Sequence, residues 1–297
     1  MMSYAKQPSH KYEQLVPLPK YSSDQPLRSQ SLQMSQWRHY IERQIGFVLP
    51  DEQEQWLINA INDTAARHQL SAVQLWEVLP SEPALNQALL DAVLIPESRF
   101  FRHKPSMQFV CEQAYEHQAI QQANRFPYRV WSVGCAMGQE VWSLAMSLRA
   151  QGIDDYRITG SDVNQQALNQ ARMGQYDERQ RRLIAPAYQR YVQPIATVGL
   201  MPKWQVADEL RDQVRFVWHN IFTQDVPMTQ LQHLIVCQNM LIYFRQFDQR
   251  DILTRLAASC EINGYIVLAP GEALFWRPKN MRRIVHPKVN AWQKISA

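Results

Sequence analysis

The spacing of hydrophobic residues changes along the chain and divides it into two folded parts. Between Trp37 and Ala92, apolar residues recur at intervals of three and four, which is the spacing of one face of an α-helix. Farther along, short apolar runs alternate with helical patterns. This alternation favours a parallel sheet covered by helices on both faces. The pattern therefore predicts an α/β domain preceded by a small all-α domain.

The boundaries follow from where each pattern begins. Residues 1–32 are polar, hold four prolines and show no sustained periodicity, so we expect a flexible N-terminal extension. Residues 33–95 are expected to form the helical domain and residues 96–297 the α/β domain. An irregular stretch around 174–213 predicts a short insertion, with strand-like runs at 189–192 and 203–206 on either side of Gly199.

Within the α/β domain the apolar runs place the individual elements. Strands are expected near 129–133, 157–161, 214–218, 233–237 and 264–269, and helices near 106–121, 138–151, 164–173 and 248–261. Ligands of such sheets lie beyond the carboxyl ends of the parallel strands. Four residues fall at those ends and are expected to converge on one edge of the sheet: Gly134, Asp162, Asn220 and Asn239.

The most informative motif is the glycine turn between the first strand and its helix. Gly134 and Gly138 allow a sharp turn, and the helix that follows points its N-terminus toward the same edge. Asp162 ends the second strand 24 positions after Gly138, near the offset at which a carboxylate accepts ribose hydroxyls. Two plainer interpretations stay open: a glycine kept for packing, and an aspartate that caps the next helix.

The turn lacks two features of diphosphate sites. It has neither the Gly-x-Gly-x-x-Gly spacing nor the Lys-Ser/Thr ending of a P-loop. A nucleoside cofactor without a diphosphate fits better, and S-adenosylmethionine is such a cofactor.

Three motifs occur together in one order: Glu97 to Arg102 (ESRFFR), Arg129 to Glu140 (RVWSVGCAMGQE) and Ile235 to Phe244 (IVCQNMLIYF). Over roughly residues 35–275 the chain resembles the CheR family of chemoreceptor glutamate O-methyltransferases. The resemblance implies a Rossmann-like S-adenosylmethionine-dependent methyltransferase domain, with S-adenosylhomocysteine as product. It also implies that the partner is the cytoplasmic domain of a methyl-accepting chemoreceptor.

The resemblance assigns roles to individual residues. Arg102 and Tyr243 would lie around the transferred methyl group. Cofactor contacts would come from Ser98, Arg102, Gly134, Gly138, Glu140, Asp162, Asn220, Ile221, Gln238 and Asn239. It further implies that residues 282–286 and 289–292 form a closing hairpin and that the insertion is a small β subdomain.

The chain departs from the family pattern at several positions. Pro96 replaces an asparagine, Gln139 an acid, Gln238 an arginine, and Pro270-Gly271-Glu272 a His-Ser-Glu signature. These changes remove donors or charges from the motifs. They suit either a specialised branch, such as one serving type IV pilus motility, or a decayed cofactor-binding module that acts as a signalling scaffold.

Composition narrows the remaining choices. Four cysteines without a CxxC pair indicate neither a disulfide framework nor a zinc site, so no metal is expected. No apolar run reaches the length of a membrane span and no signal-peptide core is present, so we expect a cytoplasmic protein. The net charge is −3 for residues 1–95 and +7 for residues 96–297, which suits an acidic protein partner.

Two other kinds of enzyme were weighed. A cysteine hydrolase would use Cys135 at a helix N-terminus, with His219 or His233 as its base. Nothing in the sequence marks either histidine as the partner of Cys135. Methylation of nucleic acid finds no support, because no stripe of aromatic and basic residues is present.

Overall fold

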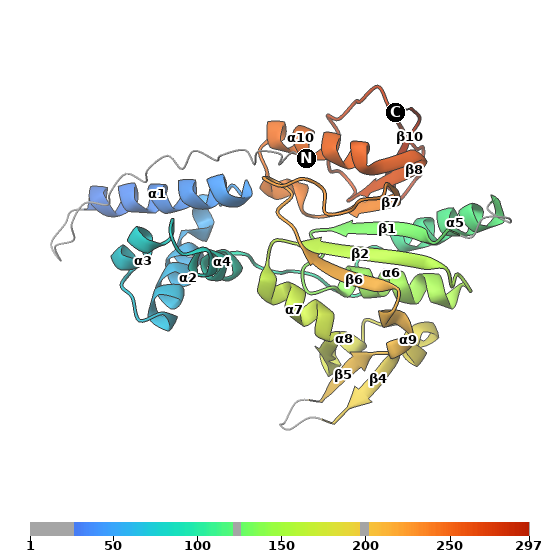
Figure 1. The fold of residues 1–297 in the computed structure, drawn as a ribbon, viewed down its shortest axis with the longest axis horizontal. Helices are drawn as coiled ribbons and strands as arrows, with labels where there is room; N and C mark the ends of the chain where they lie inside the picture. The colour runs from blue at the N-terminus through green and yellow to red at the C-terminus, as the bar shows by residue number, and fades with distance from the viewer. Residues whose placement is uncertain (1–26, 121–125, 197–201, 297) are drawn as a thin grey trace, which may run out of the picture.

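The computed structural model describes residues 27–120, 126–196 and 202–296. Four helices come first: α1 (Leu27–Ile45), α2 (Glu54–Arg67), α3 (Ala72–Val78) and α4 (Pro83–Val93). Their apolar faces enclose a separate core that includes Ile41, Leu57, Leu75 and Leu89, each of them fully buried. The predicted all-α domain is therefore present, and Figure 1 shows it beside the sheet.

Helix α1 begins earlier than the expected domain boundary at residue 33. It starts at Leu27, inside the segment that the polar pattern assigned to the extension. The run from Leu27 to Gln36 contains no proline or glycine, so helix propensity permits helix where apolar periodicity gives no signal. The rest of the expected extension, residues 1–26, lies outside the described residues.

The second part is built on a seven-stranded sheet in the order β6-β2-β1-β7-β8-β10-β9. Its strands are β1 (Tyr128–Val133), β2 (Tyr156–Asp162), β6 (Val214–Trp218), β7 (Gln232–Cys237), β8 (Cys260–Leu268), β9 (Met281–Arg283) and β10 (Asn290–Lys294). The first five in the spatial order pair in parallel, and β10 and β9 pair antiparallel. All five predicted strands and the closing hairpin are confirmed.

Successive residues of the central strands point to opposite faces, and both faces are apolar. Val130 and Leu234 belong to the core on one face, whereas Trp131 and Ile235 belong to the core on the other. Helices α5 (Lys104–Ile120), α6 (Gln139–Ala150) and α7 (Gln165–Met173) contribute to the first core, and α10 (Gln246–Ser259) to the second. Burial on both faces explains why these strands read as continuous apolar runs.

The insertion forms a second, three-stranded sheet in the order β3-β5-β4, which projects from the main sheet in Figure 1. It holds β3 (Gln175–Asp177), α8 (Glu178–Arg181), η2 (Pro186–Tyr191), β4 (Val192–Ile195), β5 (Lys203–Val206) and α9 (Asp208–Arg211). The predicted strand at 203–206 is confirmed. The run at 189–192 was wrong as a strand, because Pro186 opens a 3₁₀ turn that continues to Tyr191. Gly199 lies outside the described residues.

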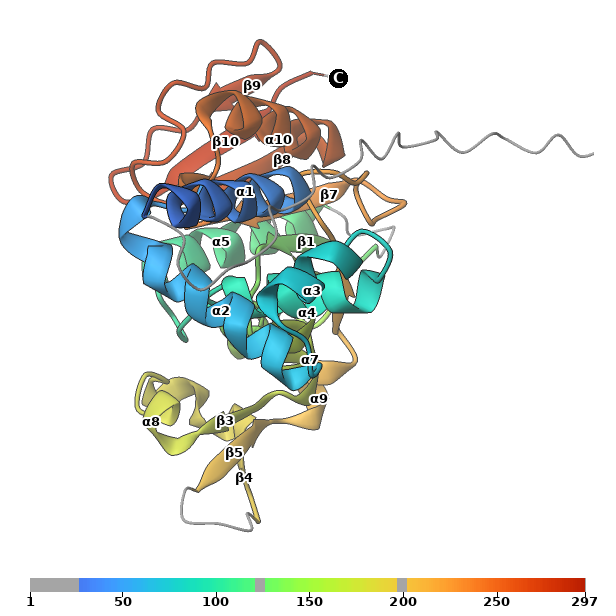
Figure 2. The same cartoon turned by 90° about the vertical axis from the view of Figure 1, so that its left-hand side faces the viewer.

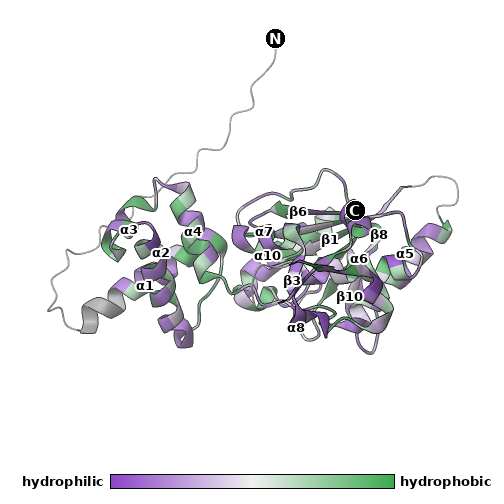
Figure 3. Cartoon of the chain, turned by 90° about the horizontal axis from the view of Figure 1, so that it is seen from below, coloured by the Kyte–Doolittle hydropathy of each residue, from purple (hydrophilic) through white to green (hydrophobic). Residues whose placement is uncertain are grey.

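The two parts meet along the edge of the sheet that the carboxyl ends of the parallel strands form. Figure 2 shows α1 crossing in front of the sheet, and Figure 3 shows the helical domain reaching the α/β domain through α4, beside α7. Backbone and side-chain hydrogen bonds join the parts. The N–H of Val48 donates to the carbonyl of Tyr243 (2.9 Å), and Nδ2 of Asn220 donates to the carbonyl of Gln44 (2.7 Å).

Candidate functional site

A pocket lies at this junction, where sequence analysis placed a ligand. Loops that follow β1, β2, β6 and β7 form one wall. The opposite wall comes from the helical domain and the linker after α4. Seven of the predicted site residues line the pocket: Arg102, Gly134, Asp162, Asn220, Ile221, Asn239 and Tyr243.

The two glycines of the β1–α6 turn have different tasks. Gly134 lines the pocket with φ of 68°, and a Cβ there would approach the sulfur of Met240 at 3.0 Å. Gly138 has φ of 87°, and a Cβ there would meet the Cβ of Ala171 at 2.8 Å. Gly138 therefore lets α6 pack closely against α7, whereas Gly134 keeps the pocket wall open.

Asp162 ends β2 with both carboxylate oxygens held by backbone groups. The N–H of Ala136 donates to Oδ2 and the N–H of Asn164 donates to Oδ1, each at 2.8 Å. Burial raises the pKa of Asp162, and these N–H groups oppose that rise. The side chain of Asn164 accepts from the N–H of Ala167 and caps α7, so Asp162 itself is not the cap. Its carboxylate retains lone pairs for a ligand in the pocket.

Glu140 lies in the first turn of α6, behind the pocket wall. Oγ of Ser132 donates to its Oε1 at 2.7 Å. Burial raises the pKa of Glu140 to about 7, the Ser132 hydroxyl and the charge on Arg102 oppose the rise, and Glu272 adds to it. Glu140 is therefore the acid near the site whose charge changes around neutral pH.

Arg102 and Tyr243 enter the pocket from different sides. Arg102 follows the linker, and its Nη2 lies 3.8 Å from Oε1 of the exposed Glu97. The Arg102 side chain keeps about a third of its surface exposed. Tyr243 lies in η3 (Leu241–Tyr243), and its ring stacks on Phe47 of the helical domain with 5.0 Å between ring centres. A cation and a phenol hydroxyl thus share one pocket.

Asn220 and Asn239 lie on the loops after β6 and β7 that line the pocket. The amide oxygen of Asn220 accepts from the N–H of Phe222 (3.1 Å), so its side chain holds the loop after β6 in shape. Asn239 has φ of 58°, a left-handed conformation that asparagine tolerates better than most residues. Both loops are thus fixed where they face the pocket.

Four predicted site residues do not line the pocket: Ser98, Gly138, Glu140 and Gln238. Gln238 is buried, and its Nε2 donates to Oγ of Ser106 (2.9 Å) and to the carbonyl of Leu268 (3.1 Å). These bonds tie β7 to α5 and β8, so this glutamine replaces the expected arginine with a structural link.

Sequence analysis missed the part of the pocket that the helical domain supplies. Ile45, at the end of α1, and Phe47 and Leu49, in the segment after it, line this part. Their signal was present, because Phe47 and Leu49 are apolar residues beyond the end of a helical pattern and just before Pro50. His219 was also missed as a pocket residue. Its Nε2 donates to the carbonyl of Asp225 (3.0 Å), which leaves Nδ1 as an acceptor.

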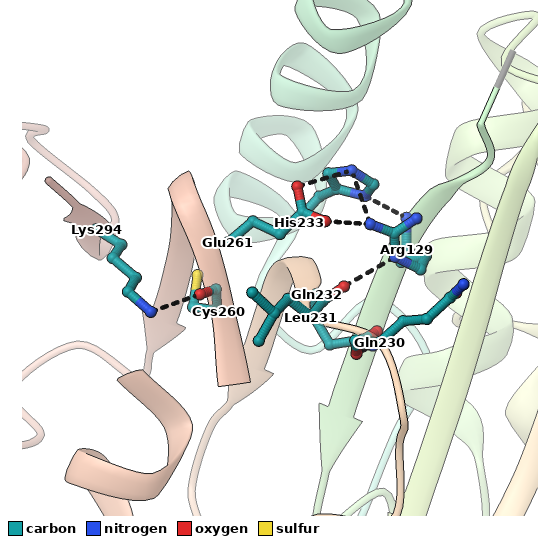
Figure 4. A network of polar contacts seen from close by, with 8 residues as sticks. All are labelled: Arg129, Gln230, Leu231, Gln232, His233, Cys260, Glu261 and Lys294. Atoms are coloured by element: carbon teal, nitrogen blue, oxygen red, sulfur yellow. Dashed lines mark hydrogen bonds and ion pairs between the residues drawn. The ribbon is translucent and has the colours of Figure 1, made fainter. Parts of the chain in front are cut away.

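The cysteine hydrolase alternative does not fit the geometry. Cys135 is buried, and burial raises the pKa of its thiol well above the usual value, so the thiolate is disfavoured. His233 begins β7 at the opposite end of the sheet, where it contacts Arg129 and Glu261 (Figure 4). Cys135 therefore lacks the activation that a nucleophile requires.

Metal sites and membrane-spanning helices can be judged for the described residues alone. They contain no group of three or more His, Cys, Asp and Glu side chains placed to hold a metal ion. Among the same residues, no helix has both the length and the apolar character needed to cross a membrane.

Known proteins share this sequence pattern. The chain is 26% identical over 245 residues to chemotaxis protein methyltransferase 1 of Vibrio cholerae, covering 79% of this chain and 86% of that protein. It is 23% identical over 271 residues to chemotaxis protein methyltransferase Cher2 of Pseudomonas putida, covering 86% and 94%. It is 26% identical over 248 residues to the probable biofilm formation methyltransferase WspC of Pseudomonas aeruginosa, covering 80% of this chain but only 57% of that protein.

The family model described as CheR methyltransferase, SAM binding domain, matches residues 96–289, well over half of the chain. This range contains six of the seven strands of the main sheet, all except β10, together with every predicted site residue. The match and the pocket at the carboxyl ends of the strands agree on S-adenosylmethionine as the cofactor. The chain belongs to the CheR methyltransferase family.

Proposed function

We propose that this protein transfers the methyl group of S-adenosylmethionine to glutamate side chains in the cytoplasmic helices of a chemoreceptor. The observation that carries the proposal is the meeting of Asp162, Arg102 and Tyr243 in one pocket. A ribose-binding acid, a carboxylate-binding cation and a phenol are the groups that this reaction requires in one place.

The residues present fit the cofactor. Asp162 offers acceptor lone pairs at the end of β2, as ribose hydroxyls require. Gly134 leaves space where a side chain would press on Met240. Phe47 and Ile221 add apolar surface, and His219 also lines the pocket. Donors, acceptors and apolar surface thus match an adenosine.

The methyl transfer requires little from the protein beyond alignment of the reacting groups. S-adenosylmethionine, when bound, supplies a methyl group on a positively charged sulfur, which leaves as a neutral thioether when a glutamate oxygen bonds to the carbon. A glutamate side chain is already ionised at neutral pH, so no strong base is needed. In this proposal Arg102 holds the carboxylate and Tyr243 orients one oxygen, which is supported by their presence in the same pocket. The helical domain covers one side of the pocket with apolar residues, which favours the exclusion of water.

The proposal of a chemoreceptor as the partner is supported by charge and by sequence similarity to known proteins. Residues 96–297 carry a net charge of +7, which favours approach of an acidic helical surface. Two of the relatives above are named chemotaxis protein methyltransferases. The receptor is accordingly proposed as the substrate, with its glutamates as the acceptors.

Transfer of radiolabelled methyl to purified cytoplasmic fragments of the organism's chemoreceptors tests the proposal. We expect label that mild alkali releases as methanol, as for a glutamyl methyl ester, and that Glu→Ala changes in the receptor abolish. Tyr243→Phe keeps the stacking on Phe47 but removes the hydroxyl, so transfer should slow by about tenfold with unchanged cofactor affinity. Tyr115→Phe, at an exposed tyrosine of α5, is the matched control.

Two outcomes would contradict the proposal. Alkali-stable label would place the methyl group on another atom. Cofactor binding without transfer to any receptor fragment would favour the decayed module, in which Pro96 and Gln238 mark lost contacts.

A further inference from the structure

The helical domain contacts the end of β2 through one buried carboxylate. Asp91, in the last turn of α4, is only 8% exposed although it is charged and lies between two domains. A buried carboxylate is costly unless several donors satisfy it. The donors that satisfy Asp91 identify what it holds.

Those donors lie at the N-terminus of α7. The N–H of Gln165 donates to Oδ1 of Asp91 (2.8 Å), and the N–H of Gln166 donates to Oδ2 (3.2 Å). Nδ2 of Asn164 donates to the backbone carbonyl of Asp91 (3.2 Å). Helix α7 therefore has two caps, one from its own Asn164 and one from the other domain.

The same contacts continue to the cofactor-binding acid. Asn164, which donates to Asp91 through its side chain, donates through its backbone N–H to Oδ1 of Asp162 (2.8 Å). Gln87 adds a parallel link, because its Nε2 donates both to Oδ1 of Asp91 (2.7 Å) and to the carbonyl of Val163 (2.9 Å). Every residue from Val163 to Gln166 is thereby fixed from α4.

The arrangement has an electrostatic cost. The charge of Asp91 raises the pKa of Asp162, so the two carboxylates repel each other across this short segment. Burial raises the pKa of Asp91 as well. A neutral residue would dock the domains without that repulsion, whereas Asp91 provides two acceptors aimed at the α7 backbone. Beyond packing the two domains together, Asp91 therefore fixes the position of the α7 backbone.

We propose that Asp91 is a positioning residue for the cofactor, which sets the place of Asp162 through α7 and so couples docking of the helical domain to binding of the ribose. The inference rests on the proposed use of S-adenosylmethionine, though not on the identity of the methyl acceptor. It makes the helical domain part of the cofactor site without a direct contact from Asp91.

Calorimetric titration of the full chain with two ligands tests this positioning role. S-adenosylhomocysteine and its 2′,3′-dideoxy analogue differ only in the hydroxyls that Asp162 is proposed to bind. We expect Asp91→Ala to weaken S-adenosylhomocysteine by about tenfold and the dideoxy analogue by less than about twofold. Asp91→Asn, which keeps an oxygen for the Gln165 N–H, should give an intermediate loss.

Arg245→Ala is the matched control. Its Nε lies 2.5 Å from Oε1 of Glu42 and also joins the two domains, but this ion pair has no link to Asp162. Both ligands should bind this variant as they bind the wild type. Thermal melting establishes whether each variant is folded. If Asp91→Ala does not fold, the comparison of the two ligands is made with Asp91→Asn.

Other results would overturn the inference. Equal losses for both ligands would make Asp91 a merely structural residue, and unchanged affinities would remove its role altogether. A wild-type protein that binds S-adenosylhomocysteine but transfers no methyl group would contradict the proposed function alone, provided the Asp91 variants behave as expected. Failure of the wild type to bind would overturn both.

Discussion

The two ends of the parallel sheet carry polar groups of similar kinds but use them differently. At the amino end, Arg129, His233 and Glu261 contact one another (Figure 4), and Nε of Arg129 also donates to the carbonyl of Leu231 (2.8 Å). At the carboxyl end, Asp162 is held by backbone N–H groups and faces a pocket. The Arg129, His233 and Glu261 side chains thus bind one another, whereas Asp162 retains lone pairs for a ligand.

Left-handed backbone conformations occur at both ends of the sheet, as at Asn263 near the start of β8, but several gather around the pocket. Gly134, Ala136 and Asn239 all have φ between 47° and 68°, and all three line the pocket at the carboxyl end. For Ala136 this conformation is costly, yet it lets the N–H reach Asp162. A carboxylate that lines a pocket and is held by a strained backbone, rather than polar residues as such, therefore marks the functional end of the sheet.

Arg129→Ala should produce the largest effect at the amino end. The change leaves Glu261 and His233 without their cation, so we expect a loss of about 2 kcal/mol in the free energy of unfolding, after allowing for partial exposure. Affinity for S-adenosylhomocysteine should stay unchanged. Urea unfolding and calorimetry measure the two quantities, with Arg157→Ala, at an exposed arginine, as control. A loss of affinity without a loss of stability would contradict the assignment of stability to the amino end and of binding to the carboxyl end.

The second expected effect is that low pH lowers the free energy of unfolding through His233 at the amino end of the sheet. Burial, followed by the charges of Arg129 and His117, lowers the pKa of His233 from 6.5 to about 3. Since the unfolded chain binds this proton and the folded protein does not, stability is present above pH 6.5 and falls as the pH decreases toward 3.

The expected size of this acid effect follows from the pKa difference. Between pH 6.5 and 5 the contribution lost is about 2 kcal/mol. In His233→Asn, Oδ1 replaces Nδ1 as the acceptor for the Arg129 N–H, so this variant should lose that part of the pH dependence. His68→Asn, at an exposed histidine, should keep it. Identical pH profiles for wild type and His233→Asn would contradict the assignment.

The smallest effect concerns Glu140, beside the pocket. Because its pKa is raised to about 7, the fraction ionised grows between pH 6 and 8, and an ionised carboxylate attracts the ammonium group of the cofactor. Affinity for S-adenosylhomocysteine should therefore rise by about threefold over this range. Glu140→Gln should flatten the profile, whereas Glu112→Gln, on the exposed face of α5, should not. If affinity still rises between pH 6 and 8 in Glu140→Gln, the pH dependence belongs to another group.

Sequence patterns predicted the sheet well, because burial on both faces makes its central strands continuous apolar runs. They also placed Asp162, since the end of an apolar run is visible in the sequence. The role proposed for Asp91 was not predictable, because its partners Asn164 to Gln166 lie 73 to 75 residues farther along the chain, a separation that local periodicity does not encode. The hydrogen bonds of Gln238 were not predictable for the same reason, as its partners Ser106 and Leu268 lie on other elements.

The second glycine of the turn shows a different limit. Gly-x-x-x-Gly predicts a turn, but only the packing shows that Gly138 faces Ala171 while Gly134 faces the pocket. A motif can therefore locate a site without saying which of its residues meets the ligand.

The central claim is that the carboxyl end of the sheet binds the cofactor through Asp162. Calorimetric titration of wild type and Asp162→Ala with S-adenosylhomocysteine tests it directly, with Asp212→Ala, at an exposed aspartate of the amino end, as control. We predict saturable binding by wild type and control and a loss of about 100-fold in Asp162→Ala, about 2.7 kcal/mol. Equal affinity in Asp162→Ala, or no binding by the folded wild type, would contradict the account.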